Sequence, residues 1–147
     1  MPLQPPLTGL RVFEMTNYIA GPYCGMILAD LGADVVKVEN PATGDASRGN
    51  PPFVNGEGAG FMALNRNKRS VAINLKHPEG RDLFLRLADT ADVVLENFRP
   101  GTVNDLNIHY EVVKARNPGI IYCSVSAFGQ TGPYGPRAGL DLIVQGM

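Results

Sequence analysis

This 147-residue sequence lacks several features that assign a protein to a class at once. It contains no apolar run long enough to span a membrane. Its net charge of −1 provides no overall field that would attract nucleic acid or an anionic membrane. Residues 1–8 contain three prolines and no basic residue, which is not the pattern of a secretory signal peptide. We therefore expect a cytoplasmic protein that partners with neither nucleic acid nor membrane.

Cysteine and histidine are scarce, with two of each. Cys24 and Cys123 lie far apart and form no CxxC motif, which predicts two reduced, buried thiols, with a disulfide as the less favoured alternative. No metal site is predicted, because His, Cys and Asp show no ligand-like spacing. The fingerprint GxGxxG is missing after the first predicted strand, which argues against a standard dinucleotide-binding domain.

Strand and helix patterns alternate along the chain. Strands are predicted at residues 10–15, 34–39, 70–76, 92–95 and 120–125. Helices are predicted at residues 20–31, 61–65, 78–88, 102–106 and 110–116, with a further helix beginning near 140. The first helix is apolar enough to predict burial on most sides, and residues 40–60 and 128–139 are predicted loops. This alternation predicts an α/β fold with a doubly wound, mostly parallel sheet.

Polar or small residues follow three of the predicted strands. The first strand is followed by residues 17–22 (NYIAGP), the third ends at Lys76, and the fourth continues into residues 96–101 (ENFRPG). The carboxyl ends of parallel strands meet at one edge of a sheet, where α/β proteins bind ligands. The sequence therefore predicts a binding crevice at this edge.

Short motifs follow one another along the chain at residues 20–22, 31–39, 44–49, 67–70, 74–76, 78–80, 92–101 and 128–133. Each is weak alone, but their order across residues 7–147 is specific. It makes the chain resemble the N-terminal part of the class III coenzyme A transferases, the CaiB/BaiF family. That family includes formyl-CoA, carnitine-CoA and succinyl-CoA transferases and α-methylacyl-CoA racemase. The resemblance implies a Rossmann-like sheet, with residues 1–147 forming a CoA-binding portion of the large domain.

The resemblance also implies coenzyme A or acyl-CoA as the ligand in the crevice. The positions that match its contacts are Tyr18, Ile19, Ala20, Ile73, Asn74, Leu75, Lys76, Asn97, Phe98 and Arg99. Lys76 and Arg99 are suited to the phosphates. The ordinary alternatives are surface cations for these two residues and a core position for Phe98. The basic cluster of Arg66, Lys68 and Arg69 is equally well interpreted as a phosphate patch or as a solvated turn.

Two positions depart from the family pattern. Asp105 and Asn40 stand where the family usually has arginines that reach coenzyme A. Arg48 and Arg137 are candidates to substitute for them. The sequence leaves open whether the departures weaken the binding of coenzyme A.

Catalysis in the transferases uses an aspartate that attacks the acyl-CoA thioester and forms a mixed anhydride. That nucleophile and the small domain are expected beyond Met147, so no catalytic nucleophile is predicted within the chain. Asp141 is a candidate auxiliary residue, or simply a charge at a helix N-terminus. The racemase branch has a histidine where this chain has Leu140, which favours transfer over racemisation.

The parent protein is therefore predicted to be an acyl-CoA:carboxylate CoA-transferase, acting on an acyl-CoA and a carboxylic acid as an interlocked homodimer. The chain is predicted to be an inactive fragment of it, with an exposed apolar face. The alternatives are a non-catalytic module that binds coenzyme A or a nucleotide, and one subunit of a split enzyme.

Overall fold

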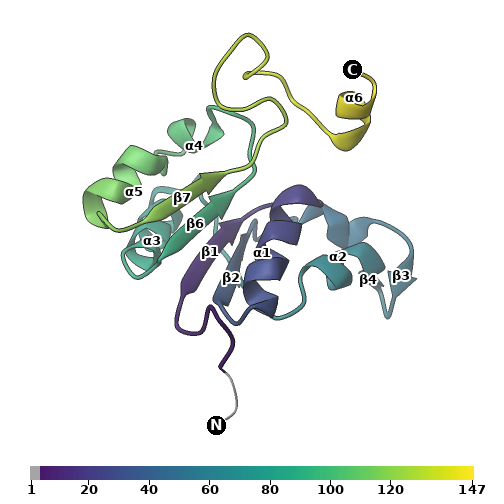
Figure 1. Cartoon of the computed structure of the whole chain (residues 1–147), viewed down its shortest axis with the longest axis horizontal. Helices are drawn as coiled ribbons and strands as arrows, with labels where there is room; N and C mark the ends of the chain where they lie inside the picture. Colours follow the sequence, from purple (N-terminus) through teal and green to yellow (C-terminus); the bar gives the residue numbers. More distant parts are fainter. Residues whose placement is uncertain (1–3) are drawn as a thin grey trace.

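A five-stranded parallel sheet organises the computed structural model, which describes residues 4–147 (Figure 1). The strand order is β5-β2-β1-β6-β7. The strands are β1 (Arg11–Met15), β2 (Asp34–Glu39), β5 (Lys68–Ala72), β6 (Val93–Glu96) and β7 (Ile121–Ser124). From β1 the chain moves outward through β2 and β5, and then returns to the other side of β1 with β6 and β7. The direction of winding thus reverses between β1 and β6, as the predicted doubly wound α/β fold requires.

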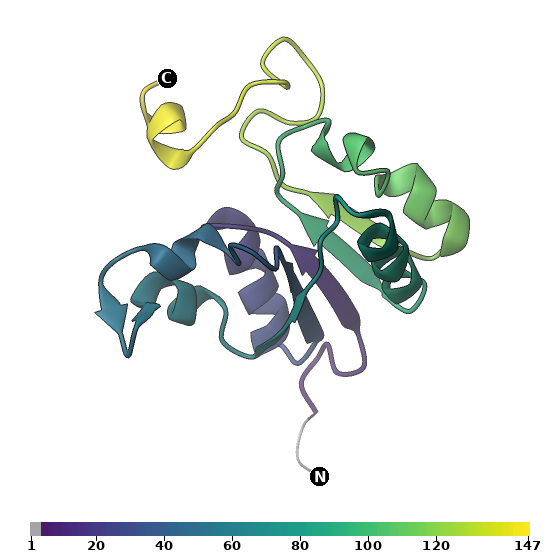
Figure 2. The same cartoon turned by 180° about the vertical axis from the view of Figure 1, so that it is seen from behind.

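Helices cover the two faces of the sheet. The helices are α1 (Ala20–Asp30), α2 (Ala59–Leu64), α3 (Pro78–Ala88), α4 (Thr102–Asp105), α5 (Tyr110–Arg116) and α6 (Asp141–Gln145). Helix α1 lies on one face, and α3 and α5 lie on the opposite face (Figures 1 and 2). None of the helices within residues 4–147 is both long and apolar enough to cross a membrane.

Two hydrophobic clusters form the core, one on each face. On the α3 side, Phe13 and Val94 of the sheet pack with Phe84 of α3 and Val113 of α5. On the α1 side, a smaller cluster joins the sheet to α1 and the turn after it, through Val12, Val35, Leu95, Ala29 and Ala33. The larger cluster therefore lies between the sheet and α3 with α5.

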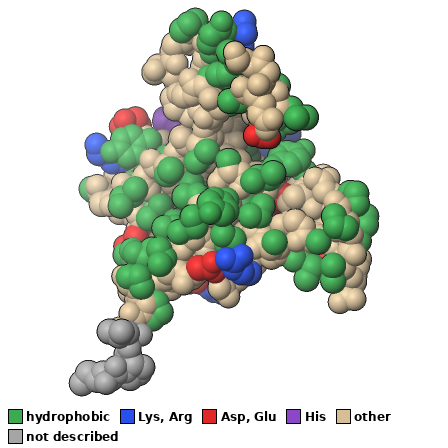
Figure 3. All heavy atoms as spheres, turned by 45° about the vertical axis from the view of Figure 1, so that its right-hand side comes forward, with side chains coloured by type: hydrophobic (Ala, Val, Ile, Leu, Met, Phe, Trp, Pro, Cys, Tyr) green, Lys and Arg blue, Asp and Glu red, His purple; other side chains and the backbone are tan. Residues whose placement is uncertain are grey.

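Glycines let α1 lie very close to the sheet. A Cβ atom on Gly25 would lie 1.8 Å from Oε2 of Glu14, and one on Gly21 would lie 2.5 Å from Cβ of Thr16. Met26 of α1 is buried and Cys24 and Leu28 are half-buried, while Ile19, Tyr23, Ile27 and Leu31 are exposed. The helix is therefore buried on most sides, as predicted, and is exposed along one apolar stripe. Hydrophobic side chains extend across the face that carries α1 (Figure 3), as expected from the sequence.

Three local expectations need correction. The third strand is Lys68–Ala72 rather than 70–76, so residues 73–76 follow the strand. The predicted loop 40–60 contains a 3-10 turn, Ala46–Gly49, and the small hairpin of β3 (Phe53–Val54) and β4 (Glu57–Gly58). Cys24 and Cys123 are half-buried free thiols, and not fully buried ones.

Candidate binding crevice

A cavity of about 270 Å³ lies at the carboxyl edge of the sheet. Segments that follow four strands form its wall. The lining residues are Thr16, Asn17, Val38, Glu39, Asn40, Thr43, Gly44, Ile73, Asn74, Leu75, Lys76, Phe98, Thr102 and Leu106. Apolar side chains and a few polar groups combined in one concave site are typical of small-molecule binding.

A pair of asparagines joins the loops after β1 and β6. The backbone N–H of Asn17 donates to Oδ1 of Asn97 at 2.9 Å. In return, Nδ2 of Asn97 donates to the carbonyl oxygen of Asn17 at 2.9 Å. The pair lies where the winding of the sheet reverses, so it fixes the two walls of the crevice relative to each other.

A buried ion cluster of Glu14, Lys37, Asp45 and Lys68 lies between α1 and the sheet. Nζ of Lys37 lies 3.1 Å from Oε1 of Glu14 and 2.9 Å from Oδ2 of Asp45. Nζ of Lys68 lies 2.8 Å from Oε2 of Glu14, and it also donates to the carbonyl oxygen of Pro22 in α1. Burial lowers the pKa of Lys68, while Glu14 acts in the opposite direction. Two buried carboxylates thus face two buried ammonium groups, which limits the cost of removing these charges from water.

Glu39 and Arg48 form a second ion pair beside this cluster. The arginine approaches both carboxylate oxygens, with Nη2 at 2.8 Å from Oε1 and Nε at 2.9 Å from Oε2. Burial alone would raise the pKa of Glu39, but hydrogen bonds from Arg48, Ser70 and the backbone of Asp45 outweigh it and bring the pKa to about 2. The guanidinium also stacks on the ring of Phe61. Arg48 is thus held by groups of its own chain.

Glu96 is a buried carboxylate at the carboxyl end of β6. Its Oε2 accepts a hydrogen bond from the backbone N–H of Phe98 at 2.8 Å. Burial raises the pKa of Glu96, although hydrogen bonds from Ser124 and the Phe98 backbone lower it in part. The side chain fixes the turn that presents Phe98 to the cavity.

Five of the residues proposed from the sequence lie together in the cavity wall: Ile73, Asn74, Leu75, Lys76 and Phe98. Ile73 is buried, while Lys76 is exposed at the rim. The other proposed residues do not line this cavity. They are Tyr18, Ile19, Ala20, Asn97, Arg99, Arg137 and Asp141.

These remaining residues have varied surroundings. Tyr18, Ile19, Ala20 and Arg99 are exposed near the crevice loops. Arg137 stacks on Tyr134, in the segment that leads to α6. Their role as ligand contacts stays a prediction.

Sequence reasoning missed about half of the cavity wall, including Thr16, Val38, Thr43 and Thr102. Val38 lies between the charged residues Lys37 and Glu39 in a predicted strand, and this alternation predicts a core position for its side chain. Thr16 and Thr43 stand in the loops after β1 and β2, and Thr102 begins α4. None of the three belongs to a distinguishing motif, so the sequence offers only their positions beyond the ends of strands as a signal.

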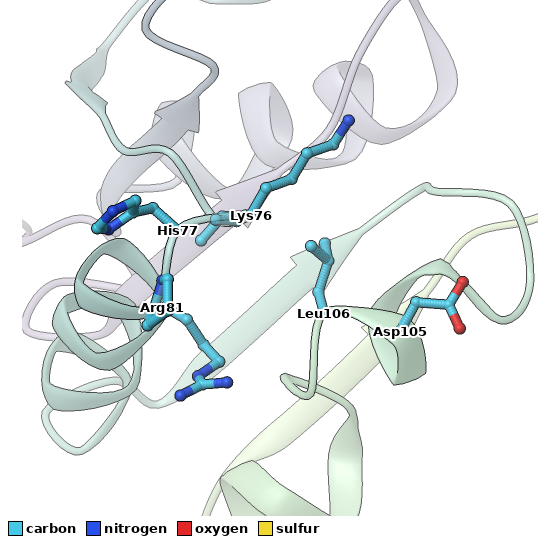
Figure 4. A pocket seen from close by; sticks show the side chains of 7 residues that line it. Lys76, His77, Arg81, Asp105 and Leu106 are labelled. Carbon is cyan, nitrogen blue, oxygen red and sulfur yellow. The ribbon is translucent and has the colours of Figure 1, made fainter.

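A smaller cavity of about 80 Å³ lies beside the first, against the start of α3. Lys76, His77, Arg81 and Asp105 contribute to its lining. Their charged ends diverge rather than converge on one point (Figure 4). This arrangement offers no focused site for an anion.

The basic cluster of Arg66, Lys68 and Arg69 lies at the start of β5, where Arg66 and Arg69 are exposed to solvent and the side chain of Lys68 is buried. Arg66 pairs with Asp30, Arg69 pairs with Asp34, and Lys68 belongs to the buried ion cluster. All three cations thus have partners within the chain. The role of the cluster as a phosphate patch stays a prediction.

Comparison with known proteins places this geometry in a family. The model of CoA-transferase family III matches residues 7–147. The chain belongs to CoA-transferase family III. It is 51% identical over 151 residues to a succinate–glutarate CoA-transferase of Agrobacterium fabrum, an alignment that covers 98% of the chain and 38% of that protein. It is 44% identical to a human succinyl-CoA:glutarate CoA-transferase, covering 94% of the chain and 32% of that protein.

Solved structures of the family agree with the fold. A CaiB/BaiF family protein from Brucella suis superposes with a TM-score of 0.92 at 48% identity, covering 98% of the chain and 39% of that protein. Rv3272 from Mycobacterium tuberculosis superposes with a TM-score of 0.88 at 45% identity, covering 94% of the chain and 39% of that protein. The chain thus spans less than two fifths of the length of these family members.

Proposed function

We propose that this chain is the coenzyme A-binding portion of an acyl-CoA:carboxylate CoA-transferase. The observation that carries the proposal is the cavity at the carboxyl edge of the sheet. The two segments nominated by their resemblance to coenzyme A contacts, residues 73–76 and Phe98, meet in its wall. Apolar groups suited to adenine and a lysine suited to phosphate therefore stand side by side.

In the proposed mechanism, this chain binds and orients the thioester. Lys76 neutralises phosphate charge at the rim, and Ile73 and Phe98 provide apolar contact. A carboxylate nucleophile in the rest of the polypeptide then accepts the acyl group as a mixed anhydride and releases the thiolate of coenzyme A. The thiolate would then attack the enzyme-derived carbonyl carbon of the anhydride, which releases the donor acid and forms a thioester between the enzyme carboxyl group and coenzyme A. The acceptor carboxylate would attack this thioester and release the thiolate again, which completes the transfer through a second anhydride. Leu140 offers no proton-transfer base, which favours transfer over racemisation.

Curated relatives suggest the first substrates to test. Several are named for succinyl-CoA with a dicarboxylic acceptor, glutarate, citramalate or mesaconate. We extend this to a succinyl donor and a dicarboxylate acceptor for the present protein. The proposed setting is a homodimer in the cytoplasm.

The test uses the complete polypeptide encoded by the gene, incubated with succinyl-CoA and glutarate. Glutaryl-CoA is measured by mass spectrometry. The Lys76→Ala variant should raise the KM for acyl-CoA roughly tenfold, because it removes one charge-assisted contact. The control variant Lys114→Ala removes another exposed lysine, on α5, and should leave the KM unchanged. The proposal would be overturned if the complete polypeptide neither bound coenzyme A nor transferred it to glutarate, citramalate or mesaconate.

A further inference from the structure

The segment between β1 and α1 has an unusual backbone at Tyr18. Its φ is +67°, in the left-handed region that residues other than glycine, asparagine and aspartate rarely adopt. A tyrosine in this conformation costs free energy, so neighbouring groups must hold it there. The adjacent residues Thr16 and Asn17 line the cavity. The conformation of Tyr18 therefore bears directly on the shape of the crevice.

Asp45 holds this backbone from another part of the chain. Its Oδ1 accepts a hydrogen bond from the backbone N–H of Tyr18 at 3.3 Å. The neighbouring residues Thr43 and Gly44 line the same cavity. A single buried carboxylate thus joins the loop after β1 to the loop after β2.

The position of Asp45 is itself fixed on every side. Its Oδ1 also accepts from the backbone N–H and the hydroxyl of Ser47, at 2.9 and 2.7 Å. Its Oδ2 lies 2.9 Å from Nζ of Lys37. That lysine in turn donates to the carbonyl oxygen of Thr16 at 2.7 Å, just before Tyr18. Lys37 and Asp45 are both almost completely buried, so their positions are set by the packing around them.

We propose that Asp45, supported by Lys37, is a positioning residue that keeps Tyr18 in its left-handed conformation and so shapes the coenzyme A crevice. This inference rests on the proposed function for the identity of the ligand. Asp45 touches no part of the ligand in this proposal. It acts through the backbone of the segment from Thr16 to Tyr18.

Coenzyme A affinity tests the proposal, measured by calorimetry on the complete polypeptide. Asp45→Ala should weaken binding roughly tenfold, since it removes the acceptor for the Tyr18 amide. In a Tyr18→Asn background the same change should cost only about twofold, because asparagine tolerates the left-handed region. Equal losses in the two backgrounds would overturn the proposal, because a purely structural role for Asp45 does not depend on residue 18.

Asp45→Asn is the conservative variant, because its Oδ1 can still accept the Tyr18 amide although the charge facing Lys37 is lost. Under conditions where it is folded, it should retain more affinity than Asp45→Ala. If it loses as much affinity, the hydrogen bond to Tyr18 is not what matters and the proposal fails. If Asp45→Ala does not fold, Asp45→Asn is compared with the unaltered protein instead, and a loss of affinity of tenfold or more would overturn the proposal.

Amide hydrogen exchange gives a readout that needs no ligand. Exchange of the Tyr18 amide should be faster in Asp45→Ala than in Asp45→Asn. If the unaltered protein binds no coenzyme A, the proposed function fails, while this exchange still decides the role of Asp45. Identical protection of Tyr18 in both variants would overturn the positioning role.

Discussion

Asn17 and Asn97 lie 80 positions apart and exchange two hydrogen bonds, each 2.9 Å long. Every bond pairs the backbone of Asn17 with the side-chain amide of Asn97. The carboxamide can donate and accept at the same time, because it carries an NH2 group and a carbonyl oxygen side by side. The pair closes the point where the sheet reverses its direction, and it gives Asn97 a structural task within the chain.

Asn97→Ala should therefore lower the free energy of unfolding by roughly 2 kcal/mol, since two partly buried hydrogen bonds are lost. Asn97→Asp keeps the acceptor and loses the donor, so its loss should be about half as large. Urea denaturation measures both. Asn104→Ala, on the exposed side of α4, is the control and should be near neutral. If Asn97→Asp matches the unaltered protein, the bond to the Asn17 carbonyl contributes nothing.

Gly25→Ala should be strongly destabilising, because its new Cβ would lie 1.8 Å from Oε2 of Glu14 and 3.2 Å from Nζ of Lys68. Forcing α1 away from the sheet should cost about 3 kcal/mol. The matched change Gly60→Ala in α2 meets no atom within 4 Å. It should stabilise the protein by about 0.5 kcal/mol, through the loss of backbone freedom in the unfolded chain. Similar thermal midpoints for the two variants would contradict the close packing of α1.

Glu39 should make stability sensitive to acid. Its pKa falls from 4.5 to about 2 on folding, so the ionised form favours the folded state. The resulting stabilisation is complete above pH 4.5 and is lost as the pH falls toward 2, a change of about 3 kcal/mol. In Glu39→Gln, the unfolding free energy should depend less steeply on pH across this window. Denaturation at several pH values measures the slope, with exposed Glu79→Gln as the control. Parallel profiles for Glu39→Gln and the unaltered protein would contradict the role of the Arg48 pair.

Glu96 should have the opposite effect. Burial raises its pKa above the usual value, so ionisation is less favourable in the folded state than in the unfolded state. The free energy of unfolding should therefore fall as the pH rises above 4.5 and level off above the folded pKa. Glu96→Gln keeps an acceptor for the Phe98 amide and cannot ionise. Its Tm, relative to that of the unaltered protein, should be higher at pH 7 than at pH 4. If the difference in Tm between Glu96→Gln and the unaltered protein is the same at pH 4 and pH 7, the prediction is wrong.

The order of strands and helices was predictable because hydrophobic periodicity and glycine or proline boundaries are local signals. Residues 73–76 and Phe98 were likewise predicted as neighbours, since each follows a parallel strand. The boundary of β5 was placed two residues late, because Lys68 and Arg69 look solvent-exposed in the sequence. Their strand positions become clear only from the acidic partners Glu14 and Asp34, which lie far away in the sequence.

The same limit applies to α1 and Asn97. An apolar helix predicts burial, but the sequence does not show that Gly21 and Gly25 bring one side of α1 against the sheet while Tyr23 and Ile27 are exposed. Asn97 was matched to a ligand contact, while its hydrogen-bond partner Asn17 could be identified only after the two loops were placed together. Long-range pairing of polar groups depends on register and loop geometry, which composition and periodicity do not specify.

The glycines that bring α1 close to the sheet also change what holds this helix in place. Gly21 and Gly25 bury almost no side-chain area, so the attachment near the start of α1 depends on the polar bond from Lys68 to the Pro22 carbonyl and on close backbone contact. Polar contacts depend on distance and direction more steeply than apolar ones do. Helix α1 is therefore better suited to keeping a fixed position than to sliding along the sheet. The loop between β1 and α1 is consequently anchored at its C-terminal end.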